Sequence, residues 1–363
     1  MSEAITRRTL VGGSLAGAGI MAAPSKRLGD IKTSIYSITY LGYWYRGDPL
    51  TIEQVADRAK MYGYQGVEIE GKRPHGFPLD WPKKRCQEFK KYAADRGLTV
   101  SGVAADNDFS SPITEHREAQ LALVHDLIRM TSDLDAKVLR IYLVWAGAIK
   151  LPEGGGRYDI PQKIWDYTQE KFTDTQRWEW CRNCFIEAAR WAGDYGVTLA
   201  LQNHKPMITN YKLMLKMIKE VNSPHFKACL DAPLLESKDP EFVRKAVYDT
   251  GSLQVQSHFG GDFEREGPGK PAQMVSVRGE WGGEYTRLGP MQQNFYLPFC
   301  QALYEIGYNG FLGYELCHPL HKLAGKLVGL DYAHTSTQLA AEFMRNTLAE
   351  AKKAAAAKLG VPS

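Results

Sequence analysis

Eight short apolar segments alternate with eight helical segments along this 363-residue chain. The predicted strands cover residues 31–40, 66–70, 98–104, 137–143, 197–201, 226–231, 253–258 and 310–315. The predicted helices cover residues 51–62, 82–96, 116–132, 174–195, 211–221, 240–248, 290–306 and 336–357. This alternation favours a parallel sheet covered by helices, and eight repeats match a closed (β/α)8 TIM barrel in the α/β class. An open doubly wound sheet is the alternative, but no GxGxxG motif follows the first strand.

Polar side chains end or follow the last four predicted strands. They are Gln202, Asp231, His258 and Glu315. Because parallel strands of a barrel all end on the same edge, where TIM-barrel chemistry collects, we expect these side chains to lie together. Oxygen donors with one imidazole suit Mn²⁺, Mg²⁺ or Co²⁺ better than a structural zinc ion. The pattern therefore predicts a divalent-metal site.

On these residues the chain resembles the sugar phosphate isomerase/epimerase superfamily, the xylose-isomerase-like TIM barrels. In that superfamily Glu, Asp, His and Glu at the ends of strands five to eight bind a divalent metal. The matching positions here are Gln202, Asp231, His258 and Glu315. The resemblance implies a metal-dependent isomerase or epimerase that acts on a keto-sugar or related carbohydrate through an enediolate. Gln202 departs from the pattern, because it carries an amide where the superfamily has a carboxylate.

An amide cannot take a proton, so the substitution at Gln202 bears on the reaction. The related epimerases use two carboxylates on opposite faces of the substrate, and only Glu315 remains of that pair. One alternative is that His204 replaces the lost base. A second is a one-base reaction, either an aldose–ketose isomerisation or a lyase-type β-elimination from a keto-glycoside. The third is a sugar-binding barrel that does not catalyse a reaction.

Further residues near strand ends are candidates for substrate binding. They are Glu70, Asp106, Trp145, Lys205, Arg265 and His318. Glu70 closes the second strand on the same face as Glu68, and Asp106 opens a segment that resembles the substrate-side loop of the superfamily. Arg265 resembles the substrate-binding arginine of the superfamily. Trp145 could provide an apolar wall for a sugar ring.

The first residues have the pattern of an export signal. Arg7 and Arg8 form a twin-arginine motif, and the apolar stretch 10–23 that follows is short and rich in glycine and alanine. We therefore expect export to the periplasm by the twin-arginine route, without stable insertion into a membrane. The predicted organisation is a signal at 1–28, a single barrel domain at 29–357 and a short tail at 358–363.

Charge and cysteine content exclude other classes of function. Without residues 1–27, the chain has 41 basic and 40 acidic side chains, so nothing indicates a nucleic-acid partner. This balance disfavours an endonuclease, although abasic-site nucleases share the barrel. Cys181 and Cys184 form a single CxxC in an apolar helical segment, which predicts buried thiols and no zinc site. The sequence is also compatible with a homo-oligomer.

Overall fold

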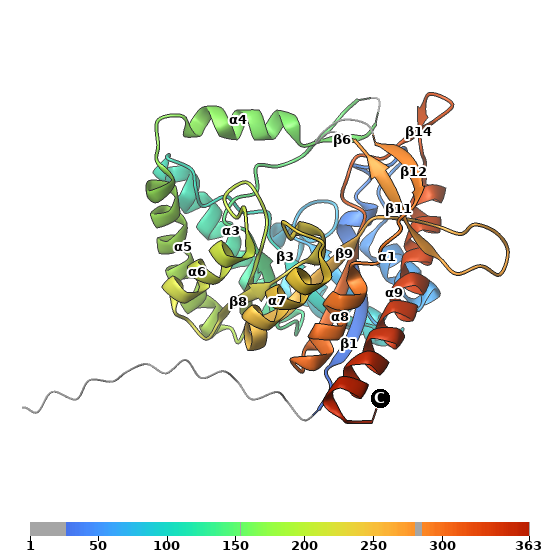
Figure 1. The fold of residues 1–363 in the computed structure, drawn as a ribbon. Helices are drawn as coiled ribbons and strands as arrows, with labels where there is room; N and C mark the ends of the chain where they lie inside the picture. The colour runs from blue at the N-terminus through green and yellow to red at the C-terminus, as the bar shows by residue number, and fades with distance from the viewer. Residues whose placement is uncertain (1–26, 153, 280–284, 363) are drawn as a thin grey trace, which may run out of the picture.

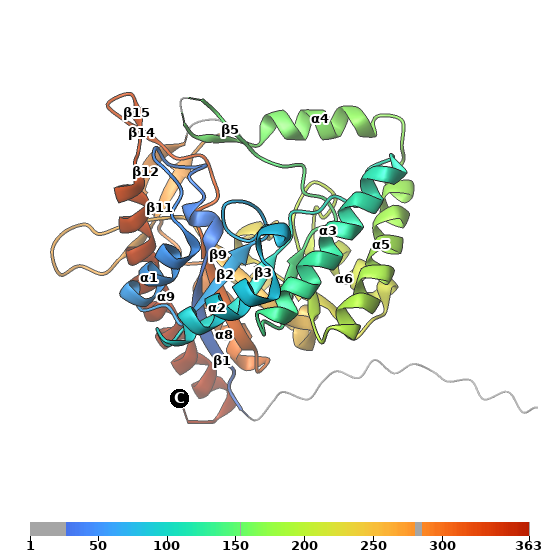
Figure 2. The same ribbon diagram turned by 180° about the vertical axis from the view of Figure 1, so that it is seen from behind.

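A closed barrel of eight parallel strands forms the centre of the computed structural model, which describes residues 27–152, 154–279 and 285–362. Helices surround the barrel (Figure 1, and from behind in Figure 2). The barrel strands are β1 (Asp30–Tyr36), β2 (Gly66–Glu70), β3 (Thr99–Ala104), β4 (Val138–Ile141), β7 (Thr198–Gln202), β8 (Phe226–Cys229), β9 (Gln254–Gly260) and β13 (Asn309–Glu315). They pair in this order, and β13 closes the ring against β1. The predicted TIM barrel is confirmed.

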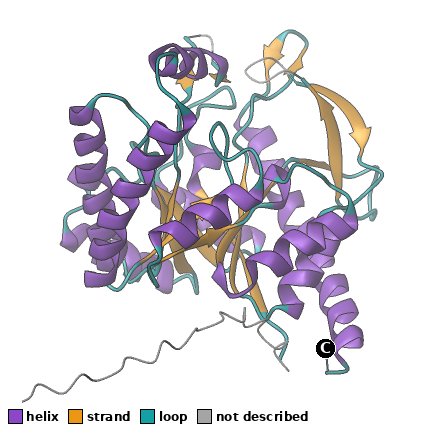
Figure 3. Ribbon diagram, turned by 60° about the vertical axis from the view of Figure 1, so that its left-hand side comes forward, coloured by secondary structure: helices purple, strands orange, loops and turns teal. Residues whose placement is uncertain are grey.

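The helices that cover the barrel follow the strands in chain order. They are α1 (Ile52–Tyr62), α2 (Lys83–Ala94), α3 (Thr114–Asp133), α5 (Asp174–Asp194), α6 (Tyr211–Val221), α7 (Pro240–Thr250), α8 (Tyr296–Glu305) and α9 (Leu330–Leu359). Figure 3 shows the strands at the centre and these helices around them.

Local sequence signals explain where several of the helices begin and end. α1 and α5 each begin with a capping box, in which Thr51 pairs with Gln54 and Thr173 pairs with Gln176. Gly63 ends α1 in the left-handed region, with a φ of 81° that a side chain would disfavour. The apolar faces then pack on the strands.

The register of the barrel brings the ends of four strands together. Gln202 at the end of β7 is level with Cys229 at the end of β8, which pairs in turn with Gln256 of β9. Glu315 at the end of β13 is level with Gly260 of β9. Residues that end or directly follow β7, β8, β9 and β13 therefore share one sector of the C-terminal edge.

Additional elements cover this C-terminal end of the barrel, at the top of Figure 1. Between β4 and α5 lie a hairpin of β5 (Ile149–Lys150) and β6 (Gly156–Arg157), and then α4 (Asp159–Gln169). The segment after β9 forms an antiparallel sheet of β10 (Asp262–Glu264), β11 (Gln273–Arg278) and β12 (Thr286–Pro290). A second hairpin, β14 (Lys322–Leu323) and β15 (Lys326–Leu327), precedes α9.

Some predicted boundaries differ from the structure. Residues 37–40, predicted as the end of the first strand, form a 3-10 turn. Helix α8 begins at Tyr296, because residues 286–290 pair with β11 as a strand. Helix α9 runs from Leu330 to Leu359 and is longer than predicted at both ends.

The twin-arginine motif at Arg7 and Arg8 lies outside the described residues. None of the helices in the described part of the chain combines the length and the apolar character needed to cross a membrane.

Candidate active site

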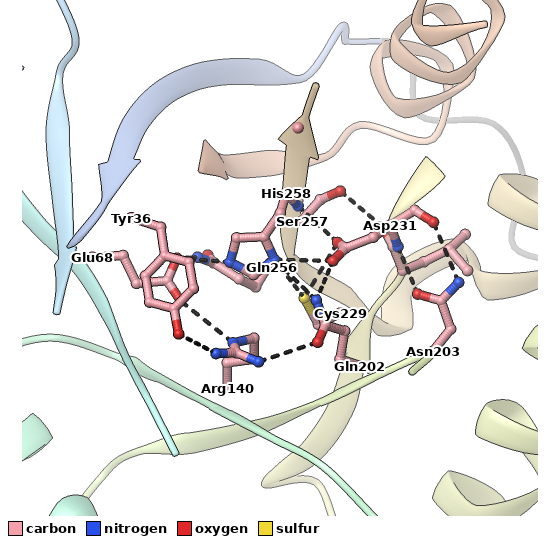
Figure 4. A network of polar contacts seen from close by, with 12 residues as sticks. Tyr36, Glu68, Arg140, Gln202, Asn203, Cys229, Asp231, Gln256, Ser257 and His258 are labelled. Atoms are coloured by element: carbon pink, nitrogen blue, oxygen red, sulfur yellow. Dashed lines mark hydrogen bonds and ion pairs between the residues drawn. The ribbon is translucent and has the colours of Figure 1, made fainter. Parts of the chain in front are cut away.

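Asp231 and His258 form the centre of a buried polar network at the C-terminal ends of β8 and β9 (Figure 4). The backbone N–H of His258 donates to Oδ1 of Asp231 over 2.7 Å, and Nδ1 of the imidazole lies 3.0 Å from Oδ2. Asn203 fixes the backbone of Asp231, because its Oδ1 accepts the Asp231 N–H over 2.8 Å. Burial opposes ionisation of Asp231, but His258 and Gln202 lower its pKa below the usual value. The carboxylate is therefore ionised and held in place.

Glu68 of β2 contacts the opposite nitrogen of the same imidazole. Its Oε2 lies 2.9 Å from Nε2 of His258 and accepts a hydrogen bond from the Gln256 amide over 2.7 Å. Burial disfavours the imidazolium, but the carboxylates of Glu68 and Asp231 raise the pKa of His258 well above its usual value. A carboxylate that accepts the second ring N–H is the arrangement that orients metal-binding histidines. It leaves Nδ1 on the side of Asp231.

Gln202 directs its amide nitrogen, and not its oxygen, toward this pair. Its Oε1 accepts a hydrogen bond from Arg140 over 3.1 Å, while its Nε2 donates to Oδ2 of Asp231 and lies 3.5 Å from Nδ1 of His258. A guanidinium can only donate and a carboxylate can only accept, so these two neighbours determine the orientation. Binding a metal through Oε1, as the sequence predicts, requires the amide to turn over and lose the bond from Arg140.

Arg140 of β4 is a fully buried cation that sequence reasoning did not assign to the site. Besides Gln202, it donates to the hydroxyl of Tyr36 and lies 3.8 Å from Oε1 of Glu68. Neither Nε of Arg140 nor Oε1 of Glu68 has a hydrogen-bond partner among the described residues. A charged residue inside an apolar strand was the available signal, because burying a charge is costly unless it is paired.

A second buried group of charges lies next to Tyr36. The Tyr36 hydroxyl donates to Glu70, and the ammonium of Lys72 lies 3.5 Å from Glu70 and contacts Asp106. Burial and the Asp106 carboxylate raise the pKa of Glu70 to about 8. Asp106 has its pKa lowered, because Lys72 outweighs the effect of burial. Glu70 and Asp106, both predicted from strand ends, are thus brought together by Lys72.

Glu315 ends β13 and faces a cavity of about 350 Å³ over the polar network. Burial raises the pKa of Glu315 above its usual value, with His258 and Arg140 opposing this shift and Asp231 reinforcing it. Of the predicted residues, the lining contains Asp106, Trp145, Gln202, His204, Glu315 and His318. The cavity thus joins a carboxyl group of raised pKa to polar and aromatic walls.

His204 and His318 line this cavity in different environments. The Nδ1 of His204 contacts the carbonyl oxygen of Lys205 and so carries the proton, and burial lowers the pKa of His204 to about 4. Burial also disfavours a charge on His318, but Asp262, with Oδ2 2.9 Å from Nε2, raises its pKa. Tyr332 donates to the other oxygen of Asp262 over 2.6 Å. His204 is therefore neutral near pH 7, while His318 gains a proton more easily than a free histidine.

The two remaining predicted residues lie elsewhere. Lys205 is exposed and lines a neighbouring cavity. Arg265 follows β10, pairs with Glu342 of α9 and donates to the carbonyl of Lys270. It does not belong to the described lining of the cavity at Glu315.

The donor atoms at the centre of the network suit a cation in part. Cys229, Asp231 and His258 each offer one donor within 4.8 Å of the others. Burial raises the pKa of the Cys229 thiol, which therefore stays protonated and is a weak donor for a hard cation. Asp231 fits as a ligand, and His258 fits once its Nδ1 releases the proton that the two neighbouring carboxylates stabilise. Glu315, which the sequence predicts as a further ligand, does not belong to this group of donors among the described residues. Gln202 fits only after its amide turns over.

Structural comparison finds the same barrel fold in several sugar epimerases. D-psicose 3-epimerase of Clostridium cellulolyticum H10, solved with D-tagatose, matches with a TM-score of 0.59 and 20% identity over 87% of this chain and 99% of that chain. An L-ribulose 3-epimerase matches with a TM-score of 0.59 and 17% identity over 90% and 97%. The 3-keto-D-glucoside 4-epimerase of E. coli, in its apo form, matches with 0.57 and 16% over 90% and 99%.

Comparison of the sequence identifies the family. No curated protein sequence matches this chain. The family model described as "Xylose isomerase-like TIM barrel" matches residues 56–347, which span the barrel from α1 to α9. The chain therefore belongs to the xylose isomerase-like TIM barrel family.

Proposed function

We propose that this protein is a divalent-metal-dependent enzyme of the sugar isomerase or epimerase type. Its substrate is a keto-sugar or related carbohydrate. The observation that carries the proposal is the Asp231–His258 pair, which Glu68 orients from behind, beneath the cavity that Glu315 lines. The similarity to psicose, ribulose and keto-glucoside epimerases supports a carbohydrate substrate.

Asp231, His258 and Glu315 would hold the metal, and a carboxylate–imidazole donor set suits Mn²⁺, Mg²⁺ or Co²⁺. When bound, such an ion would supply positive charge to stabilise the oxyanion that develops on the substrate. The Oε1 of Gln202 could join the set if its amide turned over. In its observed orientation Gln202 acts as a hydrogen-bond donor to Asp231 and does not complete the set.

Glu315 would be the base that removes a proton next to the substrate carbonyl. Its raised pKa suits that role, because a carboxylate with a higher pKa holds the abstracted proton more tightly. Gln202 cannot exchange a proton. His204 is neutral near pH 7. It can therefore accept a hydrogen bond, but it is a poor acid for protonating the opposite face of the substrate.

Gln202 cannot exchange a proton and His204 carries few protons near pH 7. These two observations favour a second candidate, a lyase that eliminates a group from a keto-glycoside. Epimerisation through two faces needs two groups that exchange protons, whereas β-elimination needs one base and an acid for the leaving group. Glu315 would serve as that base. His318, with its raised pKa beside Asp262, is the candidate acid on the cavity wall.

Metal removal tests the proposal. We expect protein stripped with a chelator to lose turnover of keto-sugars and to regain it with Mn²⁺, and Asp231→Ala to bind much less metal by elemental analysis. Asp249→Ala, which removes an exposed carboxylate from α7, is the control and should bind metal normally. Equal metal content in wild type and Asp231→Ala would contradict the proposed site.

A further inference from the structure

A second cavity adjoins the cavity at Glu315. It has a volume of about 410 Å³ and shares three wall residues with the inner cavity: Trp145, Tyr158 and His204. Its other lining residues are Ala146, Gly147, Gln162, Lys205, Pro206 and Thr209. Both volumes fall in the range of about 300–1,000 Å³ that is usual for small-molecule sites. We call the first the inner cavity and the second the outer cavity.

The outer cavity is built by segments that do not carry the proposed metal ligands. Its walls come from the segment after β4, from α4 and from the segment after β7. Helix α4 lies across the top of the molecule in Figure 1, over the C-terminal end of the barrel. None of the described residues that line this cavity is acidic. It therefore offers binding contacts next to the proposed chemistry, without a second carboxylate among its described lining residues.

An aromatic partition separates the two cavities. The ring of Trp145 stacks on Tyr142, with centroids 5.3 Å apart and an interplanar angle of 16°, and meets the edge of Tyr158 at 5.6 Å. Tyr158 packs against Trp44 at 4.7 Å, and its hydroxyl donates to the carbonyl of Cys317. These contacts hold the partition in place between the segments after β4 and β13. Because Trp145 is only half-buried, part of its ring remains available to a ligand.

The charges of the two cavities do not fit a phosphate group. The outer cavity has Lys205 as the one lysine or arginine among its described lining residues. In the described lining of the inner cavity, Lys238 is the one lysine or arginine. Its ammonium donates to three backbone carbonyls, those of Ala232, Pro233 and Leu235. Phosphate sites need several cationic or backbone N–H donors, so the lining favours a neutral ligand.

We propose that the outer cavity binds the second unit of a neutral glycoside whose reacting sugar occupies the inner cavity. This inference rests on the proposed function and names its substrate class. The aromatic faces of Trp145 and Tyr158 suit the apolar face of a ring, and the polar groups of Gln162, Lys205 and Thr209 suit its hydroxyls. A monosaccharide would leave the outer cavity without a ligand, whereas a disaccharide spans both.

Binding measurements with a blocked outer cavity test this inference. Gln162 lies on α4 and lines the outer cavity only, whereas its neighbour Lys163 is exposed and does not belong to the described lining. Gln162→Trp therefore fills the outer cavity, and Lys163→Trp is a matched control on the same helix. Thr209→Trp fills the cavity from the segment after β7, in case α4 rearranges.

The probes are glucose, glucose 6-phosphate and the disaccharides cellobiose, maltose and trehalose, measured by calorimetry with Mn²⁺ present. We expect at least one disaccharide to bind wild type more than tenfold tighter than glucose, and glucose 6-phosphate to gain nothing over glucose. Gln162→Trp and Thr209→Trp should weaken that disaccharide at least tenfold and glucose less than twofold, with no change in Lys163→Trp.

The inference is wrong if no disaccharide binds more tightly than glucose, or if the blocking variants weaken both equally. Proton exchange on keto-monosaccharides that depends on Glu315 would then still support the proposed function. If wild type binds a disaccharide as expected but exchanges no proton on keto-monosaccharides, the proposed function alone is contradicted.

Discussion

Arg140 donates a hydrogen bond to Oε1 of Gln202 over 3.1 Å, and this contact turns the amide nitrogen of Gln202 toward Asp231. The resemblance drawn from the sequence implies a carboxylate at this position, whereas the side chain of Gln202 here donates a hydrogen bond to Asp231. Gln202 therefore cannot exchange a proton with the substrate, and we propose that Glu315 is the carboxylate that does so.

Gln202→Glu should make the protein more dependent on metal. A carboxylate at this position lies against Asp231, where the amide nitrogen now donates, and the lost bond with the added repulsion should cost about 1–3 kcal/mol in chelator. A bound divalent cation would relieve the repulsion and gain a fourth anionic or imidazole ligand. We expect a lower Tm than wild type in chelator and a larger increase in Tm when Mn²⁺ is added.

Gln256→Glu is the matched control, because Gln256 is also buried and its amide donates to the Glu68 carboxylate. It should lower Tm in chelator without the larger response to Mn²⁺. An equal response in the two variants would show that position 202 has no particular relation to the metal.

Glu68→Gln should weaken metal binding without removing a ligand. Glu68 orients His258 through Nε2, and loss of such a partner typically lowers metal affinity about 10–100-fold. Titration of Mn²⁺ by calorimetry measures the change. Cys229→Ala provides the comparison, since its protonated thiol lies 3.6 Å from Nδ1 of His258 and is a weak donor. A larger loss in Cys229→Ala than in Glu68→Gln would make the thiol a ligand.

His75 should make the protein lose stability in acid. Its Nε2 donates to the carbonyl of Leu50 over 2.9 Å, its Nδ1 has no partner among the described residues, and burial lowers its pKa to about 4. The unfolded chain, with a pKa near 6.5, binds this proton first, so stability falls as the pH drops from about 6.5 to 4. At pH ~4.5, the low pKa of His75 lowers the free energy of unfolding by about 2–3 kcal/mol.

Denaturant unfolding at about pH 7 and pH 4.5 measures this loss. His75→Gln keeps a donor for Leu50 and should remove about 2–3 kcal/mol of the difference between the two pH values. His116→Gln, the same change at an exposed position on α3, should leave the difference as in wild type. An unchanged difference in His75→Gln would place the acid sensitivity elsewhere.

The barrel could be predicted from the sequence because its signals are local. Each strand is a short apolar run with a helix behind it, and the order of polar residues at strand ends follows from the parallel arrangement. Helix α4 was missed because Pro161 and the glycines before it are typical of a loop. Proline is nevertheless tolerated in the first turn of a helix, where its nitrogen needs no partner.

The contacts within the site could be predicted less well, because they join residues far apart in the chain. Glu315 ends β13 as the sequence predicts, whereas Asp231 lies two residues beyond the end of β8 and His258 two residues before the end of β9. The sequence also places Glu68 and Glu70 on one face of their strand. It does not show that Glu68 meets His258, 190 residues away, across the barrel interior. The orientation of Gln202 likewise depends on a cation from the neighbouring strand.

The most direct test of the central claim is solvent deuterium incorporation into a panel of ketoses and keto-glycosides, followed by NMR, with Mn²⁺-loaded wild type and Glu315→Gln. The amide keeps the shape and one ligand oxygen of Glu315, so Glu315→Gln should still bind the sugar. We expect wild type to exchange one proton next to the carbonyl, and Glu315→Gln to exchange it at least about 100-fold more slowly. Equal exchange in the two proteins, above the rate without enzyme, would contradict the assignment of Glu315 as the base.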